Sequence, residues 1–212
     1  MTTTVYLVRH GVTAWNVAGR LAGRLPGIPL TPDGRREAAA VAARLAALPI
    51  RAVAASPIER AQETAAVIAR PHGLPVTTDV AFIERGYTAW QGLRSQEIRE
   101  RFPDAVEMVA HGEHVPGVES VDEMAARVWV GIERLAARHP DEAVVVVSHA
   151  DPIRALLVHI IGMTAARLRA IGVGTASLSR IRFRDGGAVV DYANSRTHLV
   201  VLDGAGGSDG SE

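Results

Sequence analysis

Short apolar runs alternate with longer amphipathic stretches along most of the chain. The apolar runs predict buried strands, and they occupy residues 5–8, 52–55 and 144–147, the last of them four consecutive valines. In the longer stretches apolar residues recur at helical spacing, over residues 32–48, 57–70 and 121–139. Strands that alternate with helices indicate an α/β protein, namely a three-layer α/β/α sandwich with a mostly parallel central sheet.

Capping residues indicate where the helices begin. Thr31 and Ser56 each precede a proline, a pattern in which the hydroxyl caps the helix and proline occupies its first turn. Ser120 and Glu123 have the spacing of a capping box. A further helix is predicted to begin near Pro152, after the run of valines.

The rest of the chain completes one predicted domain over residues 1–203. Residues 175–184 and 188–193 predict a closing hairpin that turns at Asp185, Gly186 and Gly187. Residues 85–118 interrupt the alternation and are rich in His, Gly, Pro and charge, so we interpret them as an insertion that covers the site. Residues 204–212 predict a disordered tail.

Composition excludes several kinds of chemistry. The 212 residues contain no cysteine and no lysine, which removes thiolate nucleophiles, thiolate metal sites and phosphate-binding lysines. All 23 basic residues are arginine, they equal the 23 acidic residues in number, and the net charge is zero. We therefore expect neither nucleic-acid binding nor attraction to a membrane surface. The histidines lack metal-ligand spacing, so no metal site is predicted.

The amino terminus reads MTTTVYLVRHG and lacks the basic and apolar regions of a signal peptide. No apolar run approaches the roughly 18 residues that span a bilayer. We predict a cytoplasmic protein.

Polar residues stand at the ends of three predicted strands. Arg9 and His10 follow the first strand, Ser56 and Arg60 the second, and His149 the run of valines. Ligands of parallel sheets bind beyond the carboxyl ends of the strands, so we expect these side chains to share one site. A neutral imidazole is a competent nucleophile towards phosphorus, and arginines neutralise the charge of a transferring phosphoryl group.

An ordered set of motifs resembles the histidine phosphatase superfamily, which includes the cofactor-dependent phosphoglycerate mutases. The matching segments run in the family's order from about residue 3 to residue 199: Leu7 to Gly11 with Thr13, Trp15 and Asn16; Leu30 to Gly34; Ser56 to Ala61 with Thr64 and Ala65; Pro116 to Ser120 with Val118 in place of a glycine; Val147 to His149 with Ile153 and Arg154; and Asn194, His198 and Leu199. The resemblance implies a phosphoglycerate mutase-like fold.

The resemblance also implies residue roles. His10 is implied to be phosphorylated during turnover, and Glu84 to be the acid that protonates the leaving group and then activates water. The phosphoryl group is implied to be bound by Arg9, Arg60 and His149, with Asn16 adding a contact.

Glu84 has a rival in Asp151. Glu84 is followed by Trp90, Gln91 and Gly92 as in the family, although Thr88 stands where the family has glycine. Another branch of the superfamily places its acid directly after the second histidine, but Ala150 intervenes before Asp151 here. We prefer Glu84.

These features predict a phosphatase that hydrolyses a small phosphate monoester through a phosphohistidine. The first alternative is a cofactor-dependent phosphoglycerate mutase, which alone would need a 2,3-bisphosphoglycerate primer; the compact covering segment favours hydrolysis. The second is a non-catalytic phosphate-binding protein on the same fold. We expect no cofactor, a small phosphorylated metabolite as the substrate and, by default, a homodimer.

Specificity is expected to reside in residues 20–30 and 85–118. Arg20 and Arg24 suggest an anionic or polyhydroxylated ester. The arginines of the covering segment are interpreted mainly as a solvated basic face, with contact to an anionic substrate as the alternative; they are Arg85, Arg94, Arg99 and Arg101.

Overall fold

The computed structural model describes residues 1–184 and 187–199, in which a single sheet has the strand order β3-β2-β4-β1-β5-β6. The strands are β1 (Thr2–Arg9), β2 (Ile50–Ala55), β3 (Val76–Thr78), β4 (Ala143–Ser148), β5 (Leu178–Arg184) and β6 (Gly187–Ser195). The first four pair in parallel, whereas β5 and β6 are antiparallel to their neighbours. The predicted mostly parallel α/β sheet is therefore confirmed.

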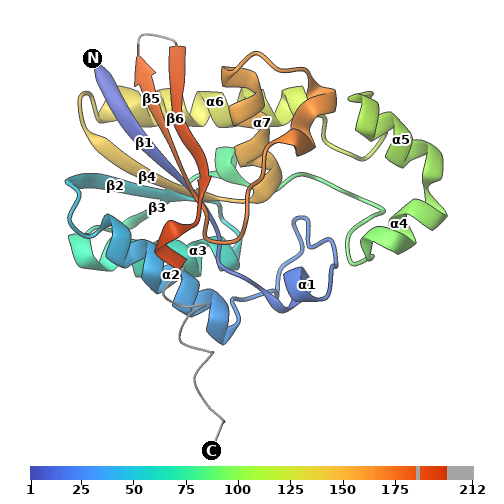
Figure 1. The fold of residues 1–212 in the computed structure, drawn as a ribbon, viewed down its shortest axis with the longest axis horizontal. Coiled ribbons are helices and arrows are strands. Elements are labelled where there is room, and N and C mark those ends of the chain that lie inside the picture. The colour runs from blue at the N-terminus through green and yellow to red at the C-terminus, as the bar shows by residue number, and fades with distance from the viewer. Residues whose placement is uncertain (185–186, 200–212) are drawn as a thin grey trace, which may run out of the picture.

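Helices cover both faces of this sheet (Figure 1). The helices α2 (Pro32–Leu45) and α3 (Glu59–Ala69) lie on one face, and α6 (Val121–Arg138) and α7 (Ala150–Ile160) lie on the other. The shorter helical segments are α1 (Ala14–Val17), α4 (Ser95–Arg101), α5 (Pro103–His111), η1 (Arg70–His72), η2 (Val80–Phe82), η3 (Ala165–Ala170) and η4 (Thr197–Leu199). None of the helices in the described residues is long and apolar enough to cross a membrane.

The central strand β4 explains why its four valines are consecutive. Val145 and Val147 pack in the apolar cluster that includes α2 and α3, whereas Val144 and Val146 pack in the cluster that includes α6 and α7. All four side chains are at most 1% exposed. A strand buried on both faces needs apolar residues at every position, so the predicted central strand is confirmed.

The predicted helix starts have different outcomes. Thr31 accepts a hydrogen bond from the Gly34 amide at 3.0 Å, and Ser120 forms the predicted capping box at the start of α6. The prediction for Ser56 is wrong, because α3 begins at Glu59 and its N-cap, Ile58, makes no side-chain hydrogen bond. The helix predicted near Pro152 is α7, which begins at Ala150.

Residues 85–118, here called the cover, carry α4 and α5 beside the sheet (Figure 1). Their apolar side chains form a separate small cluster around Tyr87 and Trp90. The two ends of the cover pair with each other, because the Thr88 amide donates to the Gly117 carbonyl and the Glu119 amide to the Gly86 carbonyl, each at 2.9 Å. The cover is therefore closed at its base by its own backbone.

The closing hairpin is formed by β5 and β6, which pair from Leu178↔Ser195 to Arg184↔Gly187. Of the predicted turn, residues 185–186 lie outside the described residues, as does the predicted tail at 204–212.

Candidate active site

The ends of three adjacent parallel strands bring the predicted chemistry together. Arg9 is the last residue of β1 and is in register with Ser148, the last residue of β4. The pairing continues into the loops, because the His10 amide donates to the Ser148 carbonyl and the Ser56 amide to the Val147 carbonyl, each at 3.0 Å. His10, Ser56 and His149 therefore emerge at the same edge of the sheet.

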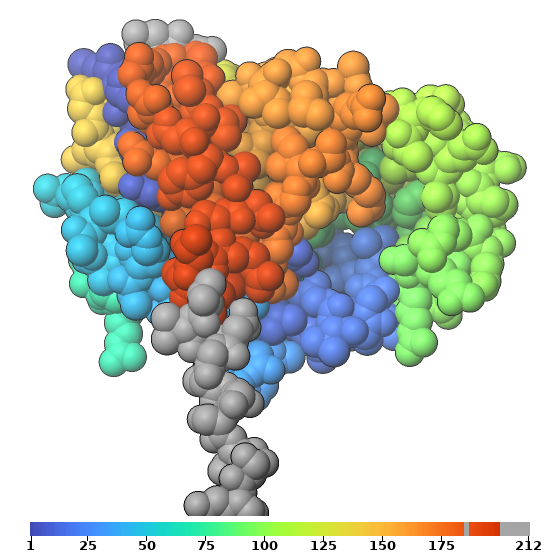
Figure 2. Space-filling view, viewed as in Figure 1, coloured from blue at the N-terminus to red at the C-terminus, as the bar shows by residue number. Residues whose placement is uncertain are grey.

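A cavity of about 140 Å³ lies at this edge. Its walls include most of the residues predicted for the site: Arg9, His10, Asn16, Arg60 and Glu84. His149 adjoins it, with its ring centroid 5.1 Å from that of His10. The molecular surface is hollowed between the segment that carries α1, the cover and the segment that carries η3 (Figure 2). We call this cavity the phosphate pocket.

Gly11 allows α2 to approach the loop that carries His10. A Cβ atom at Gly11 would lie 2.3 Å from the backbone oxygen of Gly34, far inside van der Waals contact. Any larger residue would therefore have to push the loop and the start of α2 apart.

His10 lines the pocket with its Nε2 nitrogen unprotonated. The Arg60 guanidinium donates through Nε to Nε2 of His10 at 3.3 Å, so Nε2 is the unprotonated nitrogen. The other nitrogen, Nδ1, lies 2.7 Å from the Gly11 carbonyl and must carry the proton. Burial, followed by the charges of Arg9 and Arg60, holds the pKa of His10 well below its usual value. The imidazole is therefore neutral near pH 7.

His149 has the same tautomer as His10, with its proton on Nδ1. Its Nε2 lies 2.8 Å from the Ser56 hydroxyl, which already accepts the Ile58 amide at 3.3 Å and can donate its own proton to the ring. Nδ1 of His149 is then the N–H nitrogen; it is buried, has no hydrogen-bond partner among the described residues, and lies 3.9 Å from the Glu84 carboxylate. Burial, with His10 and Arg60 adding to it, lowers the pKa of His149 well below its usual value. Ser56, predicted as a helix cap and as a polar residue at the strand end, therefore orients the second histidine.

Backbone carbonyls hold two of the arginines that line the pocket. Arg9 donates through Nη1 to the Val173 carbonyl and Arg60 through Nη2 to the Gly23 carbonyl, each at 2.8 Å. The Arg9 Nε and Arg60 Nη1 atoms are buried and lack partners in the described part of the chain. Fixed guanidinium groups with open N–H donors suit the oxygens of a phosphoryl group.

Glu84 has the environment of a proton donor. Its carboxylate accepts the Arg85 amide at 2.8 Å, and its side chain is 15% exposed. Burial, followed by the charge of Asp151, raises the pKa of Glu84 to about 7. An acid with such a pKa is protonated often enough near neutrality to act as a general acid.

Asp151, the rival acid, is held by other groups. One carboxylate oxygen accepts from Arg154 at 2.9 Å, and the other accepts the Tyr87 hydroxyl at 2.5 Å. Burial alone would raise the pKa of Asp151, but the charge of Arg169 and the Tyr87 hydrogen bond outweigh it and lower that pKa. The geometry favours Glu84 as the acid.

Asn16 lies in the pocket wall and also begins a helix. Its side-chain oxygen accepts the Thr13 amide at 3.0 Å in the capping box of α1. This contact leaves its amide nitrogen for the pocket.

The sequence profile of the histidine phosphatase superfamily (branch 1) matches residues 5–196. The chain belongs to this superfamily. The family and the phosphoglycerate mutase-like fold expected from the motifs are confirmed.

Relatives of this histidine phosphatase extend over nearly its whole length. A metal-independent phosphoserine phosphatase of Arabidopsis thaliana is 33% identical over 204 residues, which cover 93% of this chain and 83% of that protein. The solved structure of YhfR from Bacillus stearothermophilus superposes with a TM-score of 0.87 at 27% identity, covering 93% and 99% of the two chains. A mycobacterial glucosyl-3-phosphoglycerate phosphatase superposes with a TM-score of 0.82 at 28% identity, covering 92% and 100%.

The prediction of a phosphatase, a phosphoric monoester hydrolase, is confirmed by this kinship. Of the three relatives named above, the two whose names state an activity are phosphatases, which favours hydrolysis over the mutase alternative.

A clamp on the backbone of Glu84 was not predicted from the sequence. Arg24 and Arg127 both donate to the backbone carbonyl of Glu84, at 2.8 and 3.3 Å. Glu119 pairs with both arginines, at 2.9 and 2.7 Å, and also accepts the Gly86 amide at 3.1 Å. Glu119 belongs to the recognised Pro-Gly turn motif, but nothing in its local sequence indicates which arginines it meets.

Two arginines therefore differ from their predicted roles. Arg24, proposed to meet the ester, is engaged with Glu119 and the Glu84 carbonyl. Arg85, interpreted as part of a solvated face, is only 2% exposed; it donates to the Glu119 carbonyl at 2.7 Å and lies 3.7 Å from Asp151. Arg24 therefore holds the backbone of Glu84, whereas Arg85 is buried between Glu119 and Asp151.

Proposed function

We propose that this phosphatase hydrolyses small phosphate monoesters in two transfers, with His10 as the nucleophile. The observation that carries the proposal is the neutral His10 ring, whose Nε2 electron pair is held by the Arg60 donor in the phosphate pocket. The role of each residue below is part of this proposal.

In the first transfer, Nε2 of His10 attacks phosphorus in line with the departing oxygen. Arg9, Arg60 and the Nδ1–H of His149 donate to the phosphoryl oxygens, where charge is spread in the transition state. Arg60 exchanges its contact with His10 for one with an oxygen of the ester. Glu84 gives its proton to the leaving alkoxide, and a phosphohistidine and an alcohol result.

In the second transfer, water enters where the alcohol has left. Glu84, now a carboxylate, takes a proton from this water as it attacks phosphorus. The P–N bond to His10 breaks, inorganic phosphate is released, and both His10 and Glu84 return to their starting states. No metal takes part in this cycle, which is supported by the metal independence stated in the name of the Arabidopsis thaliana relative.

The test is to trap the phosphoenzyme. The full chain is mixed with ³²P-labelled phosphoserine in the presence of EDTA and quenched with alkali, in which phosphohistidine persists. We expect label on the wild type, and turnover of His10→Ala reduced by more than about 1,000-fold with no label.

The matched control is His139→Ala, which removes a histidine outside the pocket. This variant should label and turn over like the wild type, and circular dichroism should show that both variants are folded. Turnover or labelling that survives in His10→Ala would refute the nucleophile. Label that appears only when a divalent metal is supplied would refute the metal-free cycle.

A further inference from the structure

A second, larger cavity of about 440 Å³ adjoins the phosphate pocket. Leu21, Tyr87 and Arg169 line both cavities, so the two spaces share a wall. A group attached to the ester oxygen of a bound phosphate can therefore extend into the larger space. We call it the leaving-group chamber.

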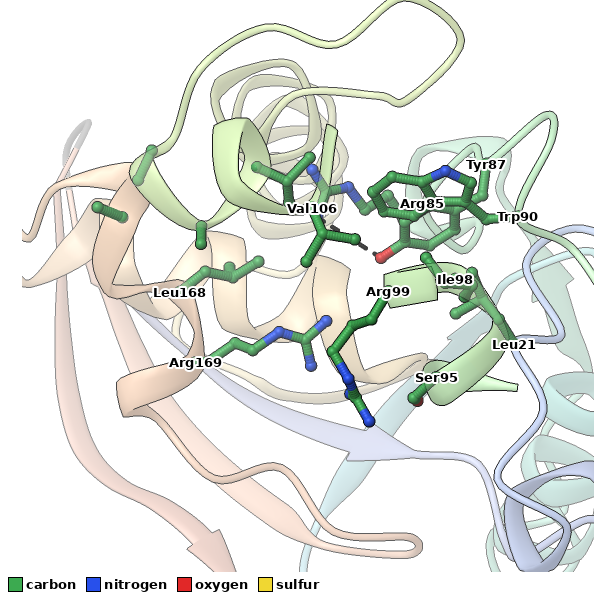
Figure 3. Close-up of a pocket in the computed structure, with 14 residues that line it drawn as sticks. Leu21, Arg85, Tyr87, Trp90, Ser95, Ile98, Arg99, Val106, Leu168 and Arg169 are labelled. Atoms are coloured by element: carbon green, nitrogen blue, oxygen red, sulfur yellow. Dashed lines mark hydrogen bonds between the residues drawn. The ribbon is translucent and has the colours of Figure 1, made fainter. Parts of the chain in front are cut away.

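Most of the chamber wall is apolar. The cover contributes one side and η3 the other, as the labelled side chains in Figure 3 show. Tyr87 and Trp90 are stacked with their ring centroids 5.8 Å apart and form an aromatic part of the wall. The aliphatic lining consists of Leu21, Ile98, Val106, Val109 and Leu168. Such a wall favours a ligand with a large apolar body, because burial of apolar surface on both partners releases water.

Three arginines line the chamber, and one of them, Arg85, is already paired with Asp151. Arg99 on α4 and Arg169 on η3 extend from opposite elements towards the same region (Figure 3). Neither makes a hydrogen bond or ion pair with any other described residue. The acid that interacts with Arg169 through its charge is Asp151, whose two oxygens are already occupied by Arg154 and Tyr87. Within the described part of the chain no acid lines the chamber, so the like charges of Arg99 and Arg169 favour an anionic ligand there.

We propose that the substrate is the phosphate monoester of a bulky, mostly apolar alcohol that carries a second anionic group. The apolar body occupies the leaving-group chamber, and Arg99 and Arg169 bind the second anion, a carboxylate or a phosphate. This proposal rests on the proposed function, since the phosphate pocket must hold the phosphorus of the same molecule. The volume of the chamber exceeds what a three-carbon leaving group fills.

The test uses esters whose alcohols have similar acidity, so that the leaving group does not change the chemistry. They are benzyl phosphate, 2-naphthylmethyl phosphate, and 2-naphthylmethyl phosphate bearing a carboxylate or a second phosphate on the far ring. We expect kcat/KM to rise about tenfold from benzyl to naphthylmethyl and about tenfold again with the better of the two anions. The two charged esters distinguish a carboxylate from a phosphate as the preferred group.

Substitutions in the chamber should change ratios between these substrates. Arg99→Gln and Arg169→Gln should each lower the ratio of kcat/KM for the charged ester over the uncharged one about tenfold. The matched controls, Arg101→Gln on α4 and Arg167→Gln on η3, lie outside the chamber lining and should leave this ratio unchanged. Val109→Trp should lower the ratio of naphthylmethyl to benzyl phosphate by filling the chamber.

Equal kcat/KM values across the series, or ratios that survive the Arg99, Arg169 and Val109 substitutions, would overturn the proposal while the phosphatase cycle stands. Absence of both turnover and phosphohistidine with every ester would instead refute the proposed function. The two failures are thus distinguishable.

Discussion

The phosphate pocket and the leaving-group chamber share a wall but are built differently. In the pocket, His10, Arg60 and His149 are at most 3% exposed, and each is held by a hydrogen bond with a residue of a loop that follows a strand or lies beside the pocket. In the chamber, Arg99 and Arg169 are exposed and lack partners among the described residues. Most of the chamber wall comes from the cover and η3.

This difference separates the residues that carry out the reaction from the residues that select the substrate. The pocket must hold donors and an imidazole in one arrangement for any phosphate ester, so its side chains are fixed by the sheet. The chamber meets only the variable part of the ester, and its cluster of side chains is distinct from the two clusters that flank the sheet. We therefore expect changes in the pocket to affect the rate for all substrates, and changes in the chamber to affect the choice among them.

Among the substitutions that test this division between pocket and chamber, the largest effect is expected at Glu84. Glu84→Gln removes the proton donor and should lower kcat about 1,000-fold for benzyl and naphthylmethyl phosphate alike. In the wild type, kcat/KM should fall above pH 7 as Glu84 loses its proton, and this limb should disappear in the variant. A loss of kcat that differs strongly between the two esters would contradict the proposed division of roles between the pocket and the chamber.

The raised pKa of Glu84 also makes the stability of the folded protein depend on pH. Comparison of the wild type with Glu84→Gln measures this dependence. Between pH 4.5, the ordinary pKa, and about 7, the folded protein retains a proton that the unfolded chain loses. This contribution makes the wild type less stable as pH rises through that window. Glu84→Gln should therefore gain thermal stability over the wild type as pH increases to 8, and an unchanged difference between pH 4.5 and 8 would contradict the shift.

A matched pair of leucines tests the contrast in stability. Leu156 on α7 is 0% exposed in the cluster beside the sheet, whereas Leu21 is partly buried against the cover. Leu156→Ala should lower the free energy of unfolding by about 3 kcal/mol, and Leu21→Ala by about 1 kcal/mol. Urea unfolding measures both. Equal losses would show that the cover is as firmly packed as the core.

The smallest expected effect is at Glu119, which links the two regions through Glu84. Glu119→Gln weakens the clamp of Arg24 and Arg127 on the Glu84 carbonyl and should lower kcat about tenfold, or about 1.4 kcal/mol. Because the loss acts through Glu84, adding Glu119→Gln to Glu84→Gln should cost nothing further. Glu133→Gln is the surface control, and additive losses in the double variant would assign Glu119 a purely structural role.

The sequence predicted the pocket well because its signals are local. Arg9, His10 and His149 each adjoin a strand whose apolar run is plain, and parallel strands place such residues at one edge. Thr31 before Pro32 is likewise marked by residue type, and the structure uses it as the predicted helix cap.

The contacts that cross from one segment to another were not predictable in this way. Ser56 has the sequence of a cap, but β2 and β4 are neighbours, so its hydroxyl meets His149. Arg85 is one charge among several in the cover, and its burial depends on how that segment folds back towards Glu119. The positions of Arg99 and Arg169 in the chamber wall depend on the same closure, which hydrophobic periodicity does not encode.

The paired base of the cover has a consequence for how this scaffold can diversify. Backbone hydrogen bonds join Gly86 to Glu119 and Thr88 to Gly117. The residues between them therefore leave the rest of the domain and return to it at neighbouring points. Such a segment behaves as a cassette: it can be lengthened, shortened or exchanged without shifting the strands that carry the histidines. Recombination at these two points offers a route to new selectivity on an unaltered reaction centre.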